Sequence, residues 1–373
     1  MLITVVVAIE LYSTLKTSHP AFLQVLDDKL TVSSFGLFGS KMSQFDYSAK
    51  EGTFGKENMV VNSDKMVWPN VIKPTNTPSK GALIGDGFLV PGKAQGAIWH
   101  LVDGQATMIT KKLSGWYYHR ALEMDVNLDG KMDIVSCRAK AGFGKPQSKL
   151  VWFDGANNFV EHEVLDGCDV NFIITDLDKN GKKEIVYTGF WSQQLAIVTS
   201  STGRFDTAAD LKTTIISKQL GKTFDLELVD LNNDGELELL VTNHQGKKDT
   251  PTGSIYAFTP VKSGPIESWT WTMRVLLSKI PVRNSGQNEA SPGSAFALPL
   301  YNTKGYPYLV AGGDGSQEAY LLTPSDIAYE YTSSVITNCE GTVGELHFDR
   351  LDGQDLLMVP CYDANEIRFF KIK

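Results

Sequence analysis

The chain lacks the short motifs that assign many enzymes to a class. None of the patterns G-x-S-x-G, H-E-x-x-H, Walker glycine loop or G-x-G-x-x-G occurs in its 373 residues. Their absence disfavours serine hydrolases, zinc proteases and nucleotide-dependent enzymes. No apolar run approaches the roughly 20 residues of a transmembrane helix, and no permitted Asn-x-Ser/Thr sequon is present. A net charge of -8 argues against a surface that binds nucleic acid.

Hydrophobic residues make up 42% of the sequence, which is enough to bury a large core in one repeat fold or two domains. Near the N-terminus, Leu2 to Ile9 forms an apolar run of the length found in signal peptides, although no basic segment precedes it. We therefore treat residues 1–20 as a signal peptide or a strand that closes the fold, and residues 21–373 as one domain. The secretory pathway is the favoured location, with the cytoplasm as the alternative.

An internal repeat dominates the rest of the chain. The acidic segment "DVNLDGKMDIV" at Asp125 returns as "DLDKNGKKEIV" at Asp176 and "DLNNDGELELLV" at Asp230, with a shortened copy, "DRLDGQDLLMV", at Asp349. An apolar segment ends each copy and recurs elsewhere without the acidic loop. The seven apolar copies align on Val32, Val90, Val135, Val186, Val241, Val310 and Val359.

The spacing of these valines, 45 to 69 residues, is typical of four-stranded propeller blades. We predict an all-β fold, a seven-bladed β-propeller whose antiparallel blades contain strands A to D from the axis outward; two β-sandwiches are the alternative. In the third blade the strands are expected in "HRALEMDV", "DIVSCRAK", "KLVWFDG" and "VEHEVL". The segment "EIRFFKIK" reads as the third strand of the last blade, so residues 4–10 are the candidate for its outer strand.

The acidic loops predict calcium sites. In each, oxygen-bearing side chains alternate along a tight turn, and a carboxylate follows three residues after a glycine. Such a shell suits calcium better than magnesium, whereas an EF-hand would need flanking helices. A solvated acidic turn without metal is the other alternative. We predict about three structural Ca²⁺ sites and no organic cofactor, and calcium at the shortened copy is doubtful. The predicted ligands are Asp125, Asn127, Asp129, Asp133, Asp176, Asp178, Asn180, Glu184, Asp230, Asn232, Asp234 and Glu238.

These three segments resemble the calcium loops of FG-GAP or VCBS-type propellers, the fold of integrin α-chain heads and of some fungal lectins. The resemblance covers nearly all blades, although three of the seven carry the full motif. It implies that calcium bridges strands A and B at one face and stabilises the fold rather than catalysing a reaction. The pattern is also similar to the calcium-containing propellers of fungal natural-product pathways, the hetero-Diels-Alderases.

A ligand site is expected at the face opposite the acidic loops. Antiparallel neighbours reverse direction, so the starts of strands A and the ends of strands B meet at the mouth of the central channel. Aromatic walls with a few charged and amide groups there suit a small organic ligand. We predict Tyr118, His119, Arg120, Arg138 and His244 as catalytic candidates. The predicted ligand contacts are Phe35, Lys93, Trp116, Asn171, Trp191, Asp225, Asn243, Asp314 and Tyr362.

Structural roles remain open for these residues. The two histidines are alternatively buried polar residues with satisfied hydrogen bonds. Arg120 and Arg138 are alternatively ion-pair partners of Asp169 or Asp125. The aromatic side chains are alternatively packed between blades.

The four cysteines occupy matching places in two blades. Cys137 ends a strand B and Cys168 precedes the next strand A, while Cys339 and Cys361 have the equivalent positions in the last blade. Two disulfides in these pairings would favour secretion, and four reduced cysteines are the alternative.

Two classes of function fit this sequence. The first is a non-hydrolytic cyclase or lyase that orients its substrate and hydrogen-bonds a developing oxyanion, as the resemblance to hetero-Diels-Alderases implies. The second is a secreted lectin-like or adhesion propeller without catalysis. Lectins of this type repeat one sugar site, whereas the seven channel-mouth segments here differ, which favours the enzyme. The expected partner is a small-molecule or glycan ligand, with no nucleic acid and no membrane span, and the protein is expected to be a monomer or weak homo-oligomer.

Overall fold

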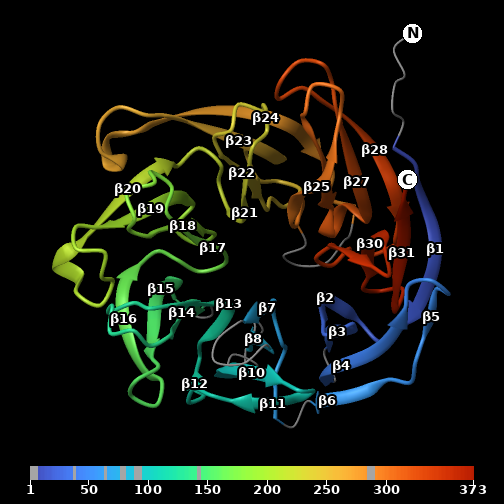
Figure 1. Cartoon of the computed structure of the whole chain (residues 1–373), viewed down its shortest axis with the longest axis horizontal. Coiled ribbons are helices and arrows are strands. Elements are labelled where there is room, and N and C mark those ends of the chain that lie inside the picture. The colour runs from blue at the N-terminus through green and yellow to red at the C-terminus, as the bar shows by residue number, and fades with distance from the viewer. Residues whose placement is uncertain are drawn as a thin grey trace.

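Seven antiparallel sheets surround one central axis in the computed structural model (Figure 1). The structure describes residues 7–36, 39–62, 65–75, 81–87, 95–140, 144–283 and 290–373. Each of these sheets is one blade with four main strands, and one sheet carries an additional short strand. The predicted all-β, seven-bladed propeller is therefore confirmed.

The strands follow the chain in blade order. Blade 1 contains β2 (Pro20–Leu26), β3 (Lys29–Gly36), β4 (Gly39–Ser48) and β6 (Asn58–Asn62), with β5 (Thr53–Phe54) beside β4. Blade 2 contains β7 (Ile72–Thr75), β8 (Gly81–Gly85), β10 (Ile98–Val102) and β11 (Gln105–Met108). A separate pair joins β9 (Gln95–Gly96) to β12 (Leu113–Ser114). Blade 3 contains β13 (Tyr117–Met124), β14 (Asp133–Lys140), β15 (Gln147–Asp154) and β16 (Val160–Asp166).

The remaining blades have the same order. Blade 4 contains β17 (Phe172–Thr175), β18 (Glu184–Gly189), β19 (Gln194–Ser200) and β20 (Leu211–Ser217). Blade 5 contains β21 (Thr223–Val229), β22 (Glu238–Asn243), β23 (Gly253–Val261) and β24 (Thr270–Ile280). Blade 6 contains β25 (Ala295–Tyr301), β26 (Pro307–Gly312), β27 (Glu318–Pro324) and β28 (Tyr331–Asn338). Blade 7 contains β29 (His347–Leu351), β30 (Gln354–Cys361), β31 (Glu366–Ile372) and β1 (Ile9–Lys16).

Helical structure is minor in the described residues. It consists of 3₁₀ turns η1 (Ala208–Asp210), η2 (Ile266–Ser268) and η3 (Asp314–Ser316). Within the same residues, we find no apolar helix of the length needed to cross a membrane.

The core lies between the blades. Every residue of β18, β22 and β26 is buried, because the second strand of a blade is covered by neighbouring blades on both faces. Their near-continuous apolar sequences are the pattern that such double burial requires. The outer strand β16 instead contains only exposed and partly buried residues, since it lies at the edge of the blade.

The last blade is completed from the other end of the chain. Strand β1 pairs antiparallel with β31, from Ile9 opposite Ile372 to Lys16 opposite Glu366. Residues 4–10 were the predicted location of this strand. The observed strand begins later, at Ile9, and residues 1–6 lie outside the described part of the chain. Residues 9–16 thus contribute to blade 7, and the edge of β31 is paired.

The predicted second strand of blade 2 is wrong. The sequence pattern assigned "FLVPGKA", around Val90, to this position. The strand is instead β8, whose Ala82, Leu83 and Ile84 are buried between β7 and β10. The signal was ambiguous because "GALIG" and "GFLVPG" are both short apolar runs between glycines. Val90 and Lys93 lie outside the described residues.

Both predicted cysteine pairs are disulfides. Cys137 is bonded to Cys168 and Cys339 to Cys361, with Cα–Cα distances of 5.3 and 5.0 Å. All four are buried. The first disulfide joins blade 3 to the start of blade 4, and the second joins blade 6 to blade 7.

Candidate functional site

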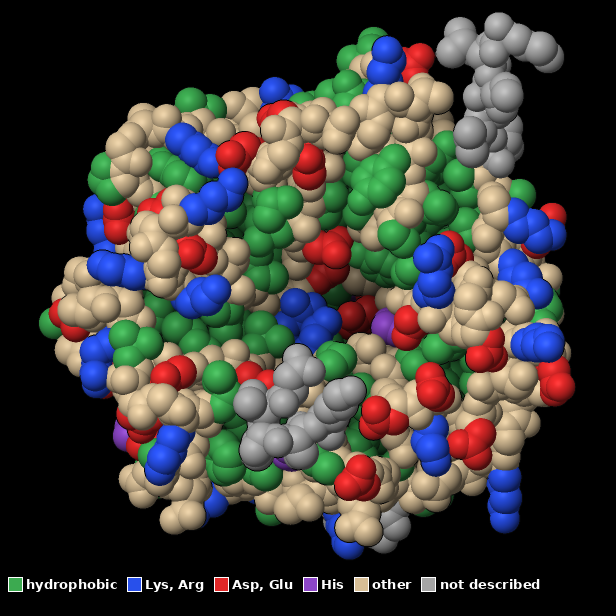
Figure 2. Space-filling view, in the orientation of Figure 1, with side chains coloured by type: hydrophobic (Ala, Val, Ile, Leu, Met, Phe, Trp, Pro, Cys, Tyr) green, Lys and Arg blue, Asp and Glu red, His purple; other side chains and the backbone are tan. Residues whose placement is uncertain are grey.

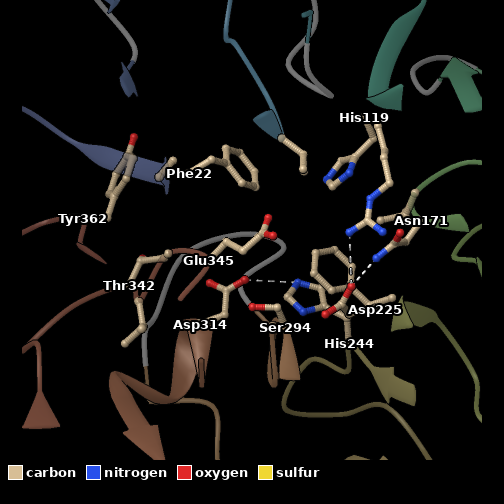
Figure 3. A pocket seen from close by; sticks show the side chains of 18 of the residues that line it. Phe22, His119, Asn171, Asp225, His244, Ser294, Asp314, Thr342, Glu345 and Tyr362 are labelled. Atoms are coloured by element: carbon tan, nitrogen blue, oxygen red, sulfur yellow. Dashed lines mark hydrogen bonds and ion pairs between the residues drawn. The ribbon is translucent and has the colours of Figure 1, made fainter. Parts of the chain in front are cut away.

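A pocket opens at one end of the propeller axis, where strands A begin and strands B end. Its cavity volume is about 230 Å³. Figure 2 shows a hollow at the centre of the ring with acidic and basic side chains around it. Every blade contributes to the wall, and Figure 3 shows side chains from across the ring converging on the cavity. The acidic loops lie between strands A and B, at the opposite ends of the same strands.

A buried cation and a carboxylate meet across the pocket. Arg120 Nη2 lies 3.7 Å from Asp225 Oδ1, and Asn171 Nδ2 donates a hydrogen bond to the same oxygen. The other oxygen, Asp225 Oδ2, accepts a hydrogen bond of 3.2 Å from the Ala295 amide. Burial raises the pKa of Asp225, while the Arg120 charge opposes this shift. The three side chains come from blades 3, 4 and 5, so closure of the ring is what assembles them.

More charged groups lie close to this pair. Lys73 Nζ lies 3.9 Å from Glu345 Oε1. Burial, with the Arg120 charge, lowers the pKa of Lys73. Burial raises the pKa of Glu227 to about 7, and the Asp225 charge adds to the effect. The Ala297 amide donates to Glu227 Oε2 at 3.1 Å. Two cations and three carboxylates therefore interact around the channel.

His119 is buried at the pocket wall among aromatic rings. The rings of Phe22 and Phe224 lie edge-on to it, with centroids 6.0 and 6.1 Å away. Its imidazole donates a hydrogen bond to the Val170 carbonyl, and its Nδ1 has no partner in the protein. Burial, together with the nearby Arg120 charge, lowers the pKa of His119 to about 3. The ring is therefore neutral at physiological pH.

His244 occupies the opposite part of the pocket. Its Nδ1 lies 2.8 Å from the Pro292 carbonyl oxygen, and its Nε2 lies 3.6 Å from Asp314 Oδ2 (Figure 3). The Phe224 ring stacks on the imidazole, with centroids 4.6 Å apart. Burial lowers the pKa of His244 to about 4, although the Pro292 carbonyl favours the protonated form.

Several buried polar atoms of the pocket have no hydrogen-bond partner within the protein. They are His119 Nδ1, Arg120 Nε, Asn171 Oδ1 and Ser294 Oγ. Leaving a buried donor or acceptor unpaired costs about 1–3 kcal/mol, so such atoms are rarely gathered by chance. The group offers both donors and acceptors to a bound molecule, while Phe22, Phe35, Phe224 and Tyr362 offer apolar contact.

The structure brings together many of the predicted site residues. Eight of them line the pocket: Phe35, His119, Arg120, Asn171, Asp225, His244, Asp314 and Tyr362. Their convergence follows from the direction of the strands, as the acidic loops indicated. Their roles toward a ligand remain predictions.

Arg138 and Trp116 do not belong to this pocket. The Arg138 guanidinium pairs with Glu161 and Glu163 on the outer strand β16, and it stacks over the Trp116 ring at 4.4 Å. Side chains alternate across a strand, and Arg138 points along the sheet toward these carboxylates rather than toward the axis. The ion-pair partner of Arg120 is Asp225, and those of Arg138 are Glu161 and Glu163, rather than the alternatives Asp125 and Asp169.

Three more predicted site residues form hydrogen bonds within the propeller. Tyr118 is fully buried and donates to Glu161 at 2.9 Å. Trp191 donates its ring N–H to Tyr117 at 3.3 Å and lines a separate surface depression. Asn243 donates to the Leu220 and Thr252 carbonyls, which holds the end of β22 in place. These side chains have hydrogen-bond partners in the propeller and do not line the axial pocket, and their roles toward a ligand remain predictions.

Sequence reasoning missed several residues of the site. Phe22, Val71 and Glu345 line the pocket, and Lys73 lies beside Glu345. Val71 and Lys73 were missed because the strands of blade 2 were misplaced. Glu345 lies just before β29, near the start of a strand A, which is the region that strand direction predicted for the channel mouth.

The three complete acidic loops share one backbone conformation. Gly130, Gly181 and Gly235 have φ values of 84°, 88° and 85°, in the left-handed region that favours glycine. Each glycine amide donates at 2.9 Å to the first aspartate of its loop, Asp125, Asp176 or Asp230. The repeat in sequence is thus a repeat in hydrogen bonding.

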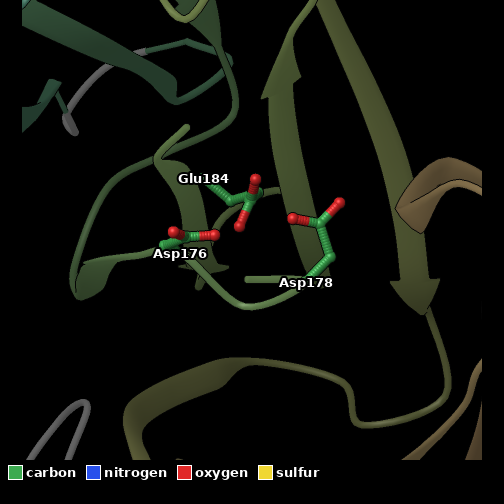
Figure 4. A group of neighbouring side chains, drawn as sticks. All are labelled: Asp176, Asp178 and Glu184. Carbon is green, nitrogen blue, oxygen red and sulfur yellow. The ribbon is translucent and has the colours of Figure 1, made fainter. Parts of the chain in front are cut away.

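The second loop has the donor arrangement that best fits a cation. Carboxylate oxygens of Asp176, Asp178 and Glu184 all lie within 4.8 Å of one another (Figure 4). Glu184 Oε2 accepts from the Leu177 amide at 2.7 Å. An all-oxygen set of this kind is what calcium prefers.

The closing carboxylates of the other two loops each accept two hydrogen bonds. Asp133 accepts from the Val126 and Gly155 amides, one to each oxygen. Glu238 accepts from the Leu231 amide and from the Tyr329 hydroxyl. These bonds stabilise the loops without metal, although the remaining lone pairs of each oxygen still permit coordination.

The shortened fourth copy forms a tight hairpin. Asp352 and Gly353, with φ values of 50° and 76°, connect β29 to β30 in the manner of a two-residue turn. Asp355 forms an ion pair with Arg350 at 2.6 Å, and Asp349 lies 3.9 Å from His347. The carboxylates of Asp349 and Asp355 are thus directed to neighbouring basic side chains.

The fold is shared with solved bacterial proteins. A candidate 6-phosphogluconolactonase from Bacteroides uniformis ATCC 8492 is similar, with 14% identity, a TM-score of 0.51 and 84% of each chain covered. Another from Bacteroides fragilis NCTC 9343 has 12% identity and a TM-score of 0.51, covering 84% of this chain and 82% of that chain. A Lactobacillus plantarum protein has 13% identity and a TM-score of 0.51, covering 88% and 86%. No protein-family model and no curated protein matches the chain.

At this level of identity, likeness establishes the fold alone. The fold and the site together define a seven-bladed β-propeller with a polar, aromatic-lined pocket on its axis. Any function has to be argued from that pocket.

Proposed function

We propose that the protein binds a small oxygenated organic molecule in the axial pocket and promotes a non-hydrolytic, ring-forming reaction of the cycloaddition type. The observation that carries this proposal is the set of unpartnered polar atoms in a cavity of about 230 Å³ whose wall also carries aromatic rings. The rings would hold the apolar part of the ligand, and the polar atoms would fix its orientation.

The arrangement supports catalysis by orientation and hydrogen bonding. Arg120 Nε is a charged, buried donor without a protein partner, suited to an oxygen whose negative charge grows in the transition state. Holding two reacting groups of one ligand, or two ligands, between Phe22 and Phe224 would supply the proximity that a ring closure needs. Neutral histidines on either side would add hydrogen bonds without placing another cation beside Arg120.

The mass of the product tests this proposal. The purified protein is incubated with α,β-unsaturated ketones, each paired with an electron-rich alkene, and the products are identified by mass spectrometry. A cycloaddition gives a product whose mass is the sum of the two reactants, formed faster with the wild type than with Arg120→Met. Products heavier by one water, or equal rates for both proteins, would contradict it.

The lectin-like alternative predicts a different result. A propeller that only binds glycans would form no adduct in the mass-spectrometry experiment and would instead bind to sugars on a glycan array. The pocket residues differ from blade to blade, which is unlike a sugar site repeated around a ring. We therefore propose catalysis rather than glycan binding.

We propose further that calcium binds the acidic loops and stabilises the propeller. Asp176, Asp178 and Glu184 support this at the second loop by their proximity. The equivalent backbone at Asp125 and Asp230 supports the same role in the first and third loops. Calcium there would link strands A and B at the face away from the pocket, and no chemistry of the ligand is assigned to it.

A further inference from the structure

His244 is held as a single tautomer by its surroundings. A carbonyl oxygen only accepts hydrogen bonds, so the 2.8 Å contact between His244 Nδ1 and the Pro292 carbonyl requires the proton on Nδ1. Nε2 then carries a lone pair. It lines the pocket, and the stacked Phe224 ring keeps the imidazole plane in place.

The partner facing Nε2 is another acceptor. Asp314 Oδ2 lies 3.6 Å from Nε2, longer than the roughly 3.2 Å limit of a direct hydrogen bond. The Nε2 of the neutral ring is unprotonated, and a proton that it gained from a ligand would be stabilised by the nearby Asp314 carboxylate. Asp314 has a φ of 48°, a left-handed conformation that is uncommon for a residue with a side chain. Such conformations cluster at functional sites.

We propose that His244 is the general base of the axial pocket, that Asp314 stabilises the resulting imidazolium, and that the substrate is an enolisable carbonyl compound. This inference rests on the proposed function for the location of the ligand, and adds a proton transfer to it. His119 Nδ1, a ring nitrogen of the same pocket without a partner in the protein, would accept a hydrogen bond from the same ligand.

The step is balanced without a co-reactant. A C–H bond next to the carbonyl breaks as an N–H bond forms at His244 Nε2. The electron pair of the C–H bond forms the carbon–carbon double bond of an enolate, whose oxygen carries the negative charge and faces Arg120. The imidazolium later returns the proton to the ring-closed product, so the proton transfer adds no atoms to the reactants and removes none.

The charged surroundings of His244 are compatible with this role. Lys222 disfavours the protonated ring, while Asp249 and Asp314 favour it. Burial, the largest effect, keeps the free imidazole neutral over the physiological range. A base that is unprotonated at the working pH is available in every molecule.

Chemical modification tests whether Nε2 carries an accessible lone pair. Diethyl pyrocarbonate acylates neutral imidazole nitrogens, and tryptic mass spectrometry reports each histidine separately. We expect His244 to be modified at a rate that stays constant from pH 7 to pH 5, with the exposed His162 as the internal reference for reagent quality. An unmodified His244 in the folded protein would overturn the proposal.

Hydrogen exchange tests the base function with a defined probe, 2-tetralone, whose aromatic body suits the Phe-lined cavity. The deuteration of C1 in D₂O is followed by NMR. It should be at least about tenfold faster with the wild type than with His244→Asn, because a general base usually contributes more than this to a rate. Asparagine retains a donor for the Pro292 carbonyl and removes Nε2. The control His162→Gln should match the wild type.

The variant Asp314→Asn tests whether the charge of Asp314 assists proton transfer or whether the residue has only a structural role. It should slow exchange while leaving His244 reactive toward diethyl pyrocarbonate, because the lone pair survives and the stabilising charge is lost. Equal exchange rates for the wild type and His244→Asn would overturn the base assignment. That result would leave the ring-forming proposal standing, since the mass-balance experiment tests it separately with Arg120→Met.

Discussion

Arg120 and Asp225 face each other across the pocket from blades that are not neighbours in the ring. The distance from Nη2 to Oδ1 is 3.7 Å, and blade 4 lies between their strands, β13 and β21. The pair therefore exists only when the ring is closed. It ties the geometry of the pocket to the integrity of the whole propeller.

Replacing Arg120 by methionine should remove function while the protein stays folded. The proposed loss in turnover is about 10²–10³-fold, the range for deleting one oxyanion donor. Asp225 would lose its cationic neighbour but keep its hydrogen bonds from Asn171 and the Ala295 amide. Turnover and circular dichroism measured on the same sample check this. Full activity in a folded Arg120→Met would remove Arg120 from the mechanism.

Replacing Arg138 by alanine should leave turnover near the wild-type value. Arg138 pairs with Glu161 and Glu163 and stacks on Trp116, away from the pocket. Losing a largely buried cation and its stacking should lower the free energy of unfolding by about 1–3 kcal/mol. Urea unfolding and a turnover assay are the measurements. A large loss of activity without a loss of stability would show that the pocket extends to Arg138.

Calcium should raise the melting temperature. A ligand at one hundred times its Kd stabilises the folded state by about 2.7 kcal/mol per site, and calorimetry in calcium against a chelator measures the shift. Glu184→Gln should reduce the shift, whereas Asp352→Asn, in the hairpin of the fourth copy, should retain it. An identical melting temperature with and without calcium would contradict calcium binding.

The buried histidines should make the protein less stable in acid. The folded pKa values of His119 and His244, about 3 and about 4, lie below the ordinary value of 6.5. Between pH 4 and pH 6.5 the unfolded chain therefore binds more protons than the folded protein. The free energy of unfolding falls as the pH drops through this range. Asp169 acts in the opposite sense, because burial raises its pKa to about 7.

The double variant His119→Asn/His244→Asn isolates the histidine contribution. Its unfolding free energy, measured by urea denaturation at several pH values, should depend less steeply on pH between 4 and 6.5 than that of the wild type. His162→Gln serves as the control and should keep the wild-type slope. A double variant with an unchanged slope would mean that the two rings are not neutral in the folded protein.

Breaking the Cys137–Cys168 disulfide should disturb the pocket as well as the fold. Cys168 lies three residues before Asn171, which bonds Asp225, and two before Val170, which accepts from His119. Cys137→Ser/Cys168→Ser should cost about 2–5 kcal/mol of stability. Below its melting temperature, the variant should also turn over substrate more slowly. Loss of stability with unchanged turnover would limit the disulfide to a structural role.

The period of the repeat made the fold readable from the sequence. Strands such as β14 and β18 are buried on both faces because neighbouring blades cover them, and the acidic turns identified the direction of each strand. Blade 2 was misread because it lacks an acidic turn and offers two apolar runs. Strand direction then predicted the end of the axis where the pocket lies.

Side-chain direction was the part that the sequence left undetermined. Arg120 and Arg138 are both basic residues near the same mouth, yet one faces Asp225 and the other Glu161. The difference depends on a register shift between Tyr118 and Ala121 in the pairing of β13 with β14. A bulge of this kind re-aims side chains and has no reliable sequence signal.

The most direct test compares turnover of three proteins at a temperature where all remain folded: the wild type, Arg120→Met and Glu184→Gln. We predict that Arg120→Met loses turnover and that Glu184→Gln keeps it, because the chemistry lies in the axial pocket and the acidic loops only stabilise the propeller. The reverse result, with activity lost in Glu184→Gln and kept in Arg120→Met, would contradict the account.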